Sequence, residues 1–271
     1  MSAVTSRTWS PAMSLAQREV VRFFRQRSRV MSAFATPLLF WAVVGSGFSS
    51  SFHASGAPDH MGTLEFFFPG TLLMIVLFTA IFATISIIED RREGFLQSVL
   101  VAPVSRAAIV LGKMLGSTAL AMVQVLPILL VAPLAGLRMT PAALGIAGGT
   151  LLLVAFGLSG LGFLIAWRLD SVQGFHAIMN LLLMPMWLLS GALFPQAGAP
   201  VWLRAIMAAN PMTYALAALR RGMYAGSVRT DAVGTGVPSL ALSLGISAAF
   251  AAVMFGLASR QARRTTSGDL H

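Results

Sequence analysis

The stretch FFPGTLLMIVLFTAIFATISII, residues 67–88, contains no charged side chain. A helix needs about 20 predominantly apolar residues to cross the hydrocarbon core of a bilayer, so this stretch is long enough to span a membrane. The rest of the 271-residue chain has the same character, because 56% of its residues are hydrophobic and only 10% are charged. Soluble domains carry about 25% charged residues. The sequence therefore predicts an all-α integral membrane protein.

Five further apolar stretches lie on either side of 67–88, separated by polar or charged connections, of which 195–237 is the longest. Each has about the length that a membrane-spanning helix requires. They run over residues 30–48, 107–134, 144–167, 175–194 and 238–258. We therefore expect one domain of six spans over residues 30–258, flanked by tails at 1–29 and 259–271.

Proline and glycine positions predict where these spans bend and pack. Pro127 and Pro133 interrupt the third span and Pro185 is expected to kink the fifth, because proline removes a helix hydrogen bond. Ser105 is predicted to cap the start of the third span. Small residues let neighbouring membrane helices approach closely. The fourth span contains six glycines, namely Gly145, Gly148, Gly149, Gly157, Gly160 and Gly162.

Residues 11–29 are too charged to span a membrane, but their pattern predicts an amphipathic helix. At helical spacing, Arg18, Arg22, Arg25 and Arg29 fall on one face. The opposite face carries Met13, Ala16, Val20, Phe23 and Phe24. We expect this helix to lie in the headgroup plane, with its arginines towards anionic lipid and its phenylalanines in the acyl boundary. A soluble amphipathic tail is the alternative.

The formal net charge of +10 comes from basic residues at the ends of apolar stretches rather than from a soluble basic module. We therefore expect the lipid bilayer, and no nucleic acid, as the partner of these charges. With the amino terminus inside, most arginines lie on the inner side. The outer side then holds only Arg138, Arg204, Arg220, Arg221 and Arg229. This bias predicts a multi-pass protein of the cell (inner) membrane with both termini in the cytoplasm.

The residues that catalysis would require are scarce. A membrane enzyme needs ionisable groups at the reaction site, and the predicted spans are almost empty of them. The nearest approach to a phosphate-binding loop, Gly112-Lys113-Met114, lacks its upstream glycine and hydroxyl residue. We predict no catalytic residue, cofactor or metal site, although His53, Asp59 and His60 share one outer loop as a weak cation-binding alternative. Energy for any transport must come from a partner or an ion gradient, and the ion gradient is disfavoured because all nine acidic residues map to loops, span edges or tails.

Residues 89–104 combine a charged start with a compact apolar patch. Glu89, Asp90 and Glu93 favour the positive end of a short helix. The patch consists of Phe95, Leu96, Val99 and Leu100. Such a helix is marginal alone and would gain burial in a groove of a partner protein. A simple connecting loop is the alternative.

Three motifs, in this order, resemble the type-2 ABC transporter permease family of drug, polysaccharide and lipid exporters. The first runs from Glu89-Asp90-Arg91-Arg92-Glu93-Gly94-Phe95-Leu96 to Ala102-Pro103-Val104-Ser105-Arg106. The second is Leu189-Ser190-Gly191-Ala192-Leu193-Phe194-Pro195, and the third is Asn210-Pro211-Met212-Thr213-Tyr214 with Leu219-Arg220. The resemblance covers almost the whole chain.

The resemblance implies a permease subunit that pairs with a second copy or close relative and with cytoplasmic ATP-binding ABC subunits. It implies that residues 89–104 form the coupling helix that contacts the ATPase. The interrupted segment 195–237 is predicted to form helices packed at the far membrane face, and a partly re-entrant segment is the alternative. The resemblance implies that Asn210, Pro211, Thr213 and Tyr214 form its outer-face motif, for which a plain turn between helices is the alternative. Two other functions remain open at this point, a membrane-embedded lipid-linked transferase and a non-transporting ABC-coupled protein.

Overall fold

The computed structural model describes residues 2–25, 63–101, 104–137, 139–193, 199–224 and 237–264, together with the single positions 31, 35, 39 and 43. Its long helices are α1 (Ser2–Arg25), α3 (Thr63–Phe82), α6 (Arg106–Leu130), α7 (Pro141–Ala166), α8 (Val172–Trp187) and α11 (Leu240–Arg264). The shorter elements are η1 (Ala83–Ile85), α4 (Ser86–Arg92), α5 (Phe95–Val101), η2 (Ala132–Ala135), η3 (Leu188–Ala192), α9 (Val201–Ala209) and α10 (Pro211–Tyr224). The described chain is helical, without strands.

Among the residues that the structure describes, five helical segments are long and apolar enough to cross a membrane. They cover residues 65–92, 106–130, 141–166, 172–192 and 240–264, and correspond to the second to sixth predicted spans. The first predicted span, 30–48, lies outside the described residues except for four helical positions. The structure thus confirms a multi-pass helical protein, whereas the count of six spans stays a prediction.

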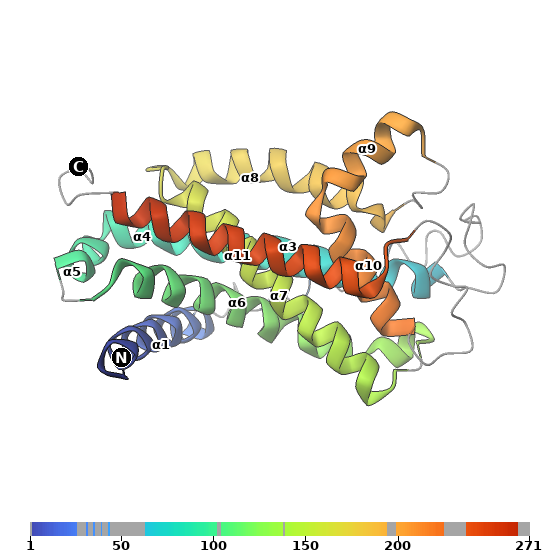
Figure 1. The fold of residues 1–271 in the computed structure, drawn as a ribbon, viewed down its shortest axis with the longest axis horizontal. Coiled ribbons are helices and arrows are strands. Elements are labelled where there is room, and N and C mark those ends of the chain that lie inside the picture. Colours follow the sequence, from blue (N-terminus) through green and yellow to red (C-terminus); the bar gives the residue numbers. More distant parts are fainter. Residues whose placement is uncertain are drawn as a thin grey trace.

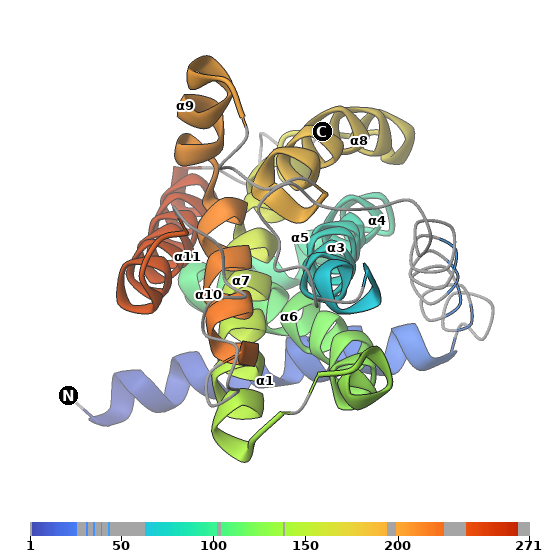
Figure 2. The same cartoon turned by 90° about the vertical axis from the view of Figure 1, so that its right-hand side faces the viewer.

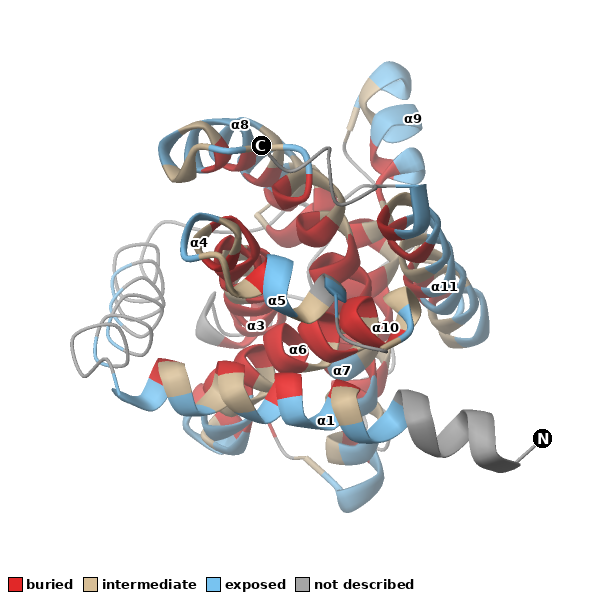
Figure 3. Ribbon diagram, turned by 90° about the vertical axis from the view of Figure 1, so that its left-hand side faces the viewer, coloured by how far each residue is buried: buried red, intermediate tan, exposed pale blue. Residues whose placement is uncertain are grey.

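The spanning helices run side by side along the long axis of the molecule (Figure 1). One end carries α1, α4, α5, the start of α6 and the carboxyl ends of α7 and α11, and α1 crosses the bundle there rather than running along it (Figures 1 and 3). We call this the basic end, after Arg18, Arg22, Arg91, Arg92, Arg106, Arg168, Arg260, Arg263 and Arg264. Helices α9 and α10 lie towards the opposite end (Figures 1 and 2).

Helix α3 is the interior helix of the bundle. Of the apolar core of its spanning segment 78% is buried, against 17% in α11. A helix that is apolar all round is expected where other helices surround it. Phe68, Leu72 and Leu73 of α3 are fully buried, whereas Val253 and Leu257 of α11 are about half exposed. Figure 3 shows the same contrast between the buried centre and the exposed outer helices.

Two local predictions about helix ends and breaks can be compared with the backbone. The Ser105 hydroxyl accepts a hydrogen bond from the Ala108 amide at 3.2 Å, which confirms Ser105 as the cap of α6. Helix α6 continues through Pro127 and ends at Leu130. Helix α8 likewise continues through Pro185. The backbone leaves helical geometry only further along, at Gly191 in η3, whose φ is 90°. Glycine adopts this conformation without the steric cost of a Cβ.

The glycine-rich fourth span packs closely over only half of its length. A Cβ placed on Gly157, Gly160 or Gly162 would lie within 3 Å of a side chain of α11, α6 or α3–η1. A Cβ on Gly145, Gly148 or Gly149 would meet nothing within 4 Å. The prediction of close packing therefore holds for the half of α7 nearer the basic end.

Candidate functional site

Helix α1 is docked onto α6 through residues without bulky side chains. A Cβ on Gly112 would lie 2.7 Å from the carbonyl oxygen of Ala12, and a Cβ on Gly116 would lie 2.9 Å from the side chain of Glu19. Ala12 and Ala16 are buried in this contact. The glycines let the two backbones approach, and this approach brings the charged residues of α1 to the end of the bundle.

A buried ion cluster joins α1, α4 and α6 at this point. The Nζ atom of Lys113 donates to Oε1 of Glu19 at 2.6 Å, to Oγ of Ser86 at 3.3 Å, and to the Asp90 carboxylate. Side-chain exposure is 3% for Lys113, 4% for Glu19 and 0% for Asp90. Charges this deeply buried are tolerated only when they are paired and hydrogen-bonded. Because α1 contributes Glu19, the cluster is complete only while α1 is docked on the bundle.

Two arginines of α1 close the cluster from the outside. Arg18 donates to both oxygens of Asp90 at 3.0–3.1 Å. Arg22 lies 3.3 Å from Asp90 and 3.3 Å from Glu89, and it donates to Glu93 at 3.0 Å. Burial opposes the charge of Arg18, but the hydrogen bond and the negative charge of Asp90 outweigh it and raise the pKa of Arg18 above its ordinary value.

These contacts correct the predicted faces of the amino-terminal helix. Arg18 and Arg22 point to carboxylates of the protein rather than to lipid. Phe23 is 6% exposed and packs with Ala83 and Leu120. Phe24 remains 49% exposed, on the same side as Trp9 and Met13. Arg25 is exposed, and Arg29 lies outside the described residues.

The segment after α4 turns back on the bundle at Gly94, whose φ is 74°. In α5 the Phe95 ring lies 3.7 Å below the Arg18 guanidinium carbon. Leu96 is 1% exposed and belongs to the central hydrophobic core. This differs from the predicted patch for a partner, since Leu96 faces inward and Val99 is half-buried. The exposed side of α4–α5 is formed by Arg92, Glu93, Gln97, Ser98 and Val101.

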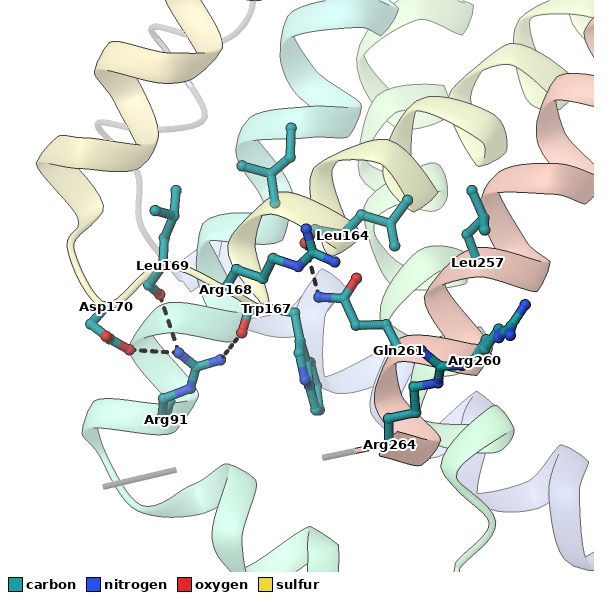
Figure 4. Close-up of a pocket in the computed structure, with 11 residues that line it drawn as sticks. Arg91, Leu164, Trp167, Arg168, Leu169, Asp170, Leu257, Arg260, Gln261 and Arg264 are labelled. Atoms are coloured by element: carbon teal, nitrogen blue, oxygen red, sulfur yellow. Dashed lines mark hydrogen bonds and ion pairs between the residues drawn. The ribbon is translucent and has the colours of Figure 1, made fainter. Parts of the chain in front are cut away.

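A second set of contacts ties α4 to the turn between α7 and α8 (Figure 4). Arg91 donates to Asp170 at 2.7 Å and to the carbonyls of Trp167 at 2.5 Å and Leu169 at 3.2 Å. Arg92 donates to the Asp170 carbonyl at 2.6 and 3.0 Å. Helix α4 is therefore held from two sides, by α1 and α6 on one and by α7–α8 on the other.

The predicted outer-face motif supports the break in α8. Asn210 donates to the carbonyl of Met186 at 2.7 Å, and Thr213 donates to that of Leu189 at 3.3 Å. Asn210 also accepts from the Met212 amide at 3.0 Å, and Pro211 is the first residue of α10. The motif thus satisfies carbonyls at the broken end of α8. The Tyr214 hydroxyl donates to the exposed carbonyl of Ala208.

Arg220 completes this arrangement from inside the bundle. It donates to the carbonyl of Gly191 at 3.1 Å, and its guanidinium carbon lies 4.6 Å over the Phe66 ring. Most of α10 is buried against α3, α7, α11 and η3. The predicted segment 195–237 therefore contains a buried helix as well as the more exposed α9.

Sequence reasoning missed two residues of the ion cluster, Glu19 and Ser86, and considered Lys113 only as part of an incomplete phosphate-binding loop. One signal was available, because Glu19 is a carboxylate among apolar residues of an amphipathic helix and Lys113 is the only lysine in the chain. A buried acid and a buried base in apolar surroundings are expected to pair. The loop residues His53, Asp59 and His60 lie outside the described residues.

The fold and these contacts define a multi-pass helical membrane protein whose charged residues join helices at one end of the bundle. The sequence profile of the ABC-2 type transporter family matches residues 12–224. The chain belongs to this family, which confirms the resemblance stated above.

The chain is similar to several proteins that are named as permeases. The chain is 29% identical over 209 residues to a transport permease, ycf38, of Cyanophora paradoxa, covering 76% of this chain and 71% of the relative. It is 27% identical over 194 residues to the daunorubicin resistance ABC transporter permease protein DrrB1 of Streptomyces coeruleorubidus, covering 69% and 66%. It is 27% identical over 150 residues to the multidrug ABC transporter permease YbhR of Escherichia coli, covering 55% and 41%. A role as a permease subunit follows from this membership.

Proposed function

We propose that the chain is the membrane-spanning subunit of an ATP-driven exporter that acts as a dimer with cytoplasmic ATP-binding subunits. Family membership carries this proposal. The names of two relatives, which refer to daunorubicin resistance and to multidrug transport, favour an amphipathic organic molecule as the substrate. The basic end then faces the cytoplasm, as the positive-inside rule predicts.

The exposed side of α5 is the surface that we assign to the ATPase. Its outward residues are Gln97, Ser98 and Val101, and Val101 is 80% exposed. Leu96 anchors the same short helix in the core. A short helix face that combines one apolar side chain with polar ones suits a groove in a partner protein.

The contacts of α4 supply a route for coupling. Helix α4 follows α3 and η1 without a gap in the chain, and α3 is the interior helix of the bundle. Arg18, Arg22 and Lys113 bind α4 to α1 and α6, and Arg91 binds it to the end of α7. A displacement of α5 by the ATPase would therefore move several spans together and expose the substrate path to alternate sides.

The test compares two exposed valines at opposite ends of the molecule. Val101→Asp is expected to reduce recovery of the ATPase in co-purification severalfold and to lower transport in proteoliposomes, because it puts a charge into the contact. Val201→Asp on α9 is the matched control, since Val201 is 74% exposed. Leu96→Asp does not serve the purpose because it would damage the core. Normal ATPase recovery and normal transport with Val101→Asp would contradict the assignment.

A further inference from the structure

An open pocket of about 1130 Å³ lies at the basic end, on the other side of α4 from the ion cluster. The carboxyl ends of α7 and α11 and the end of α4 form its walls (Figure 4). Arginine dominates the polar lining, with Asp170 as the single carboxylate among the lining residues. The arginines are Arg91, Arg168, Arg260 and Arg264.

The charges of this pocket are unbalanced. Asp170 is already paired with Arg91 at 2.7 Å, and Arg91 further donates to two backbone carbonyls. Within the described part of the chain, Arg168, Arg260 and Arg264 form no ion pair. Figure 4 shows Arg168 extending from the end of α7 towards α11, which contributes the other two. Three guanidinium groups thus surround one pocket without a counter-charge from the described protein.

The apolar part of the pocket lies on the side of the spans. Leu164 and Ile165 from α7 and Leu257 from α11 line it. Leu257 is 45% exposed, so this wall continues onto the exposed apolar surface of α11. Trp167 lines the pocket at the end of α7 and stacks on Phe163 with ring centroids 5.0 Å apart. Trp167 itself is 5% exposed and belongs to the core. Arg168 closely follows the apolar span 141–166, and Arg260 and Arg264 lie at the end of the segment 240–264, so the pocket lies where the spans end.

We propose that this pocket binds the phosphate of an anionic phospholipid headgroup, with an acyl chain along Leu164, Leu257 and the outer face of α11. Arginine forms paired hydrogen bonds with phosphate oxygens and is more weakly hydrated than lysine, so it suits this ligand. Basic pockets between spanning helices at the cytoplasmic side are typical sites for anionic headgroups. A free phosphate ion offers the same kind of oxygen acceptors but would leave the apolar wall without a ligand.

The binding test uses the full chain purified in detergent and native mass spectrometry, with phosphatidylglycerol, phosphatidylcholine or inorganic phosphate added. Phosphatidylglycerol is expected to stay bound, phosphatidylcholine to bind about tenfold more weakly, a difference of ~1.4 kcal/mol, and inorganic phosphate not to displace the anionic lipid. Arg168→Gln combined with Arg264→Gln should weaken phosphatidylglycerol binding by at least about tenfold.

Arg263→Gln is the matched control, because Arg263 is exposed on α11 next to Arg264 but does not line the pocket. It should bind phosphatidylglycerol as the unmodified chain does. If the double variant is unstable by thermal unfolding, Arg260→Gln alone carries the comparison, since Arg260 is exposed. Equal lipid binding by the pocket variants and the control would overturn the proposal. Displacement of the lipid by inorganic phosphate, or equal binding of both lipids, would overturn it as well.

Discussion

The Nζ atom of Lys113 in α6 lies 2.6 Å from Oε1 of Glu19 in α1, and the two residues are 94 positions apart in the sequence. Both side chains are at most 4% exposed. A pair in such surroundings resists separation, because either partner left alone would be a buried, uncompensated charge. This contact makes the position of α1 depend on the interior of the bundle.

Lys113→Met is therefore expected to destabilise the protein by about 3–5 kcal/mol, the usual cost of removing one partner of a buried pair. The change leaves Glu19 buried without its main cation. Thermal unfolding in detergent measures the effect. Glu19→Gln added to Lys113→Met should restore part of the loss, because the unpaired carboxylate is then removed. Glu19→Gln alone completes the cycle, and a loss in the double variant equal to the sum of the two single losses would show that the two charges are not coupled.

The close approach of α1 and α6 can be tested at Gly112. Its Cβ position lies 2.7 Å from the backbone oxygen of Ala12, which cannot move without moving the whole helix. Gly112→Leu should displace α1 and separate its paired arginines from Asp90, seen as faster trypsin cleavage after Arg18 and Arg22. Gly148→Leu is the matched control, since nothing lies within 4 Å of its Cβ position. Equal cleavage rates in the two variants would contradict the observed packing.

The two phenylalanines of α1 should behave differently. Phe23 is 6% exposed against the bundle, so Phe23→Ser should lower stability in detergent by a few kcal/mol, about the cost of emptying a buried aromatic site. Phe24 is 49% exposed, so Phe24→Ser removes few contacts within the protein. It should leave the unfolding temperature in detergent nearly unchanged. Similar losses in both variants would mean that α1 presents a different face to the bundle.

The span positions follow from hydropathy alone, because crossing a bilayer requires long apolar helices whatever their neighbours are. The faces of those helices were harder to predict. An exposed lipid-facing leucine and a buried core leucine look the same in a sequence, so Leu96 could not be separated from the exposed residues of α5. Similarly, Arg18 and Arg22 have the spacing of a lipid-facing stripe, and only the tertiary fold brings Asp90 within reach.

Membrane orientation gives a prediction that uses the absence of cysteine from the chain. Single cysteines at Ser98 in α5 and Ala205 in α9 replace exposed residues towards opposite ends of the bundle. With both termini in the cytoplasm, an impermeant maleimide added to intact cells should label only the variant at Ala205. Both variants should be labelled after permeabilisation. Labelling of Ser98→Cys in intact cells would reverse the predicted orientation.

The last prediction concerns the broken end of α8. Asn210 donates to the Met186 carbonyl at 2.7 Å and accepts from the Met212 amide at 3.0 Å. Asn210→Asp keeps the acceptor but loses the donor and places a carboxylate against a carbonyl oxygen, at a site that is 8% exposed. An unsatisfied buried polar group costs about 1–3 kcal/mol, and more when it is charged. We therefore expect Asn210→Asp to destabilise more than Thr213→Val, which removes one bond of 3.3 Å.

Tyr214→Phe is the control for this comparison, because the tyrosine hydroxyl bonds an exposed carbonyl that water can also satisfy. It should leave thermal unfolding nearly unchanged. Hydrogen exchange of peptides over residues 186–193 provides the local measurement, and exchange should be fastest in Asn210→Asp because the supporting contact to α8 is lost. If Tyr214→Phe increased exchange as much as Asn210→Asp does, the motif would act as a plain turn between α9 and α10, and the break in α8 would hold by its own packing.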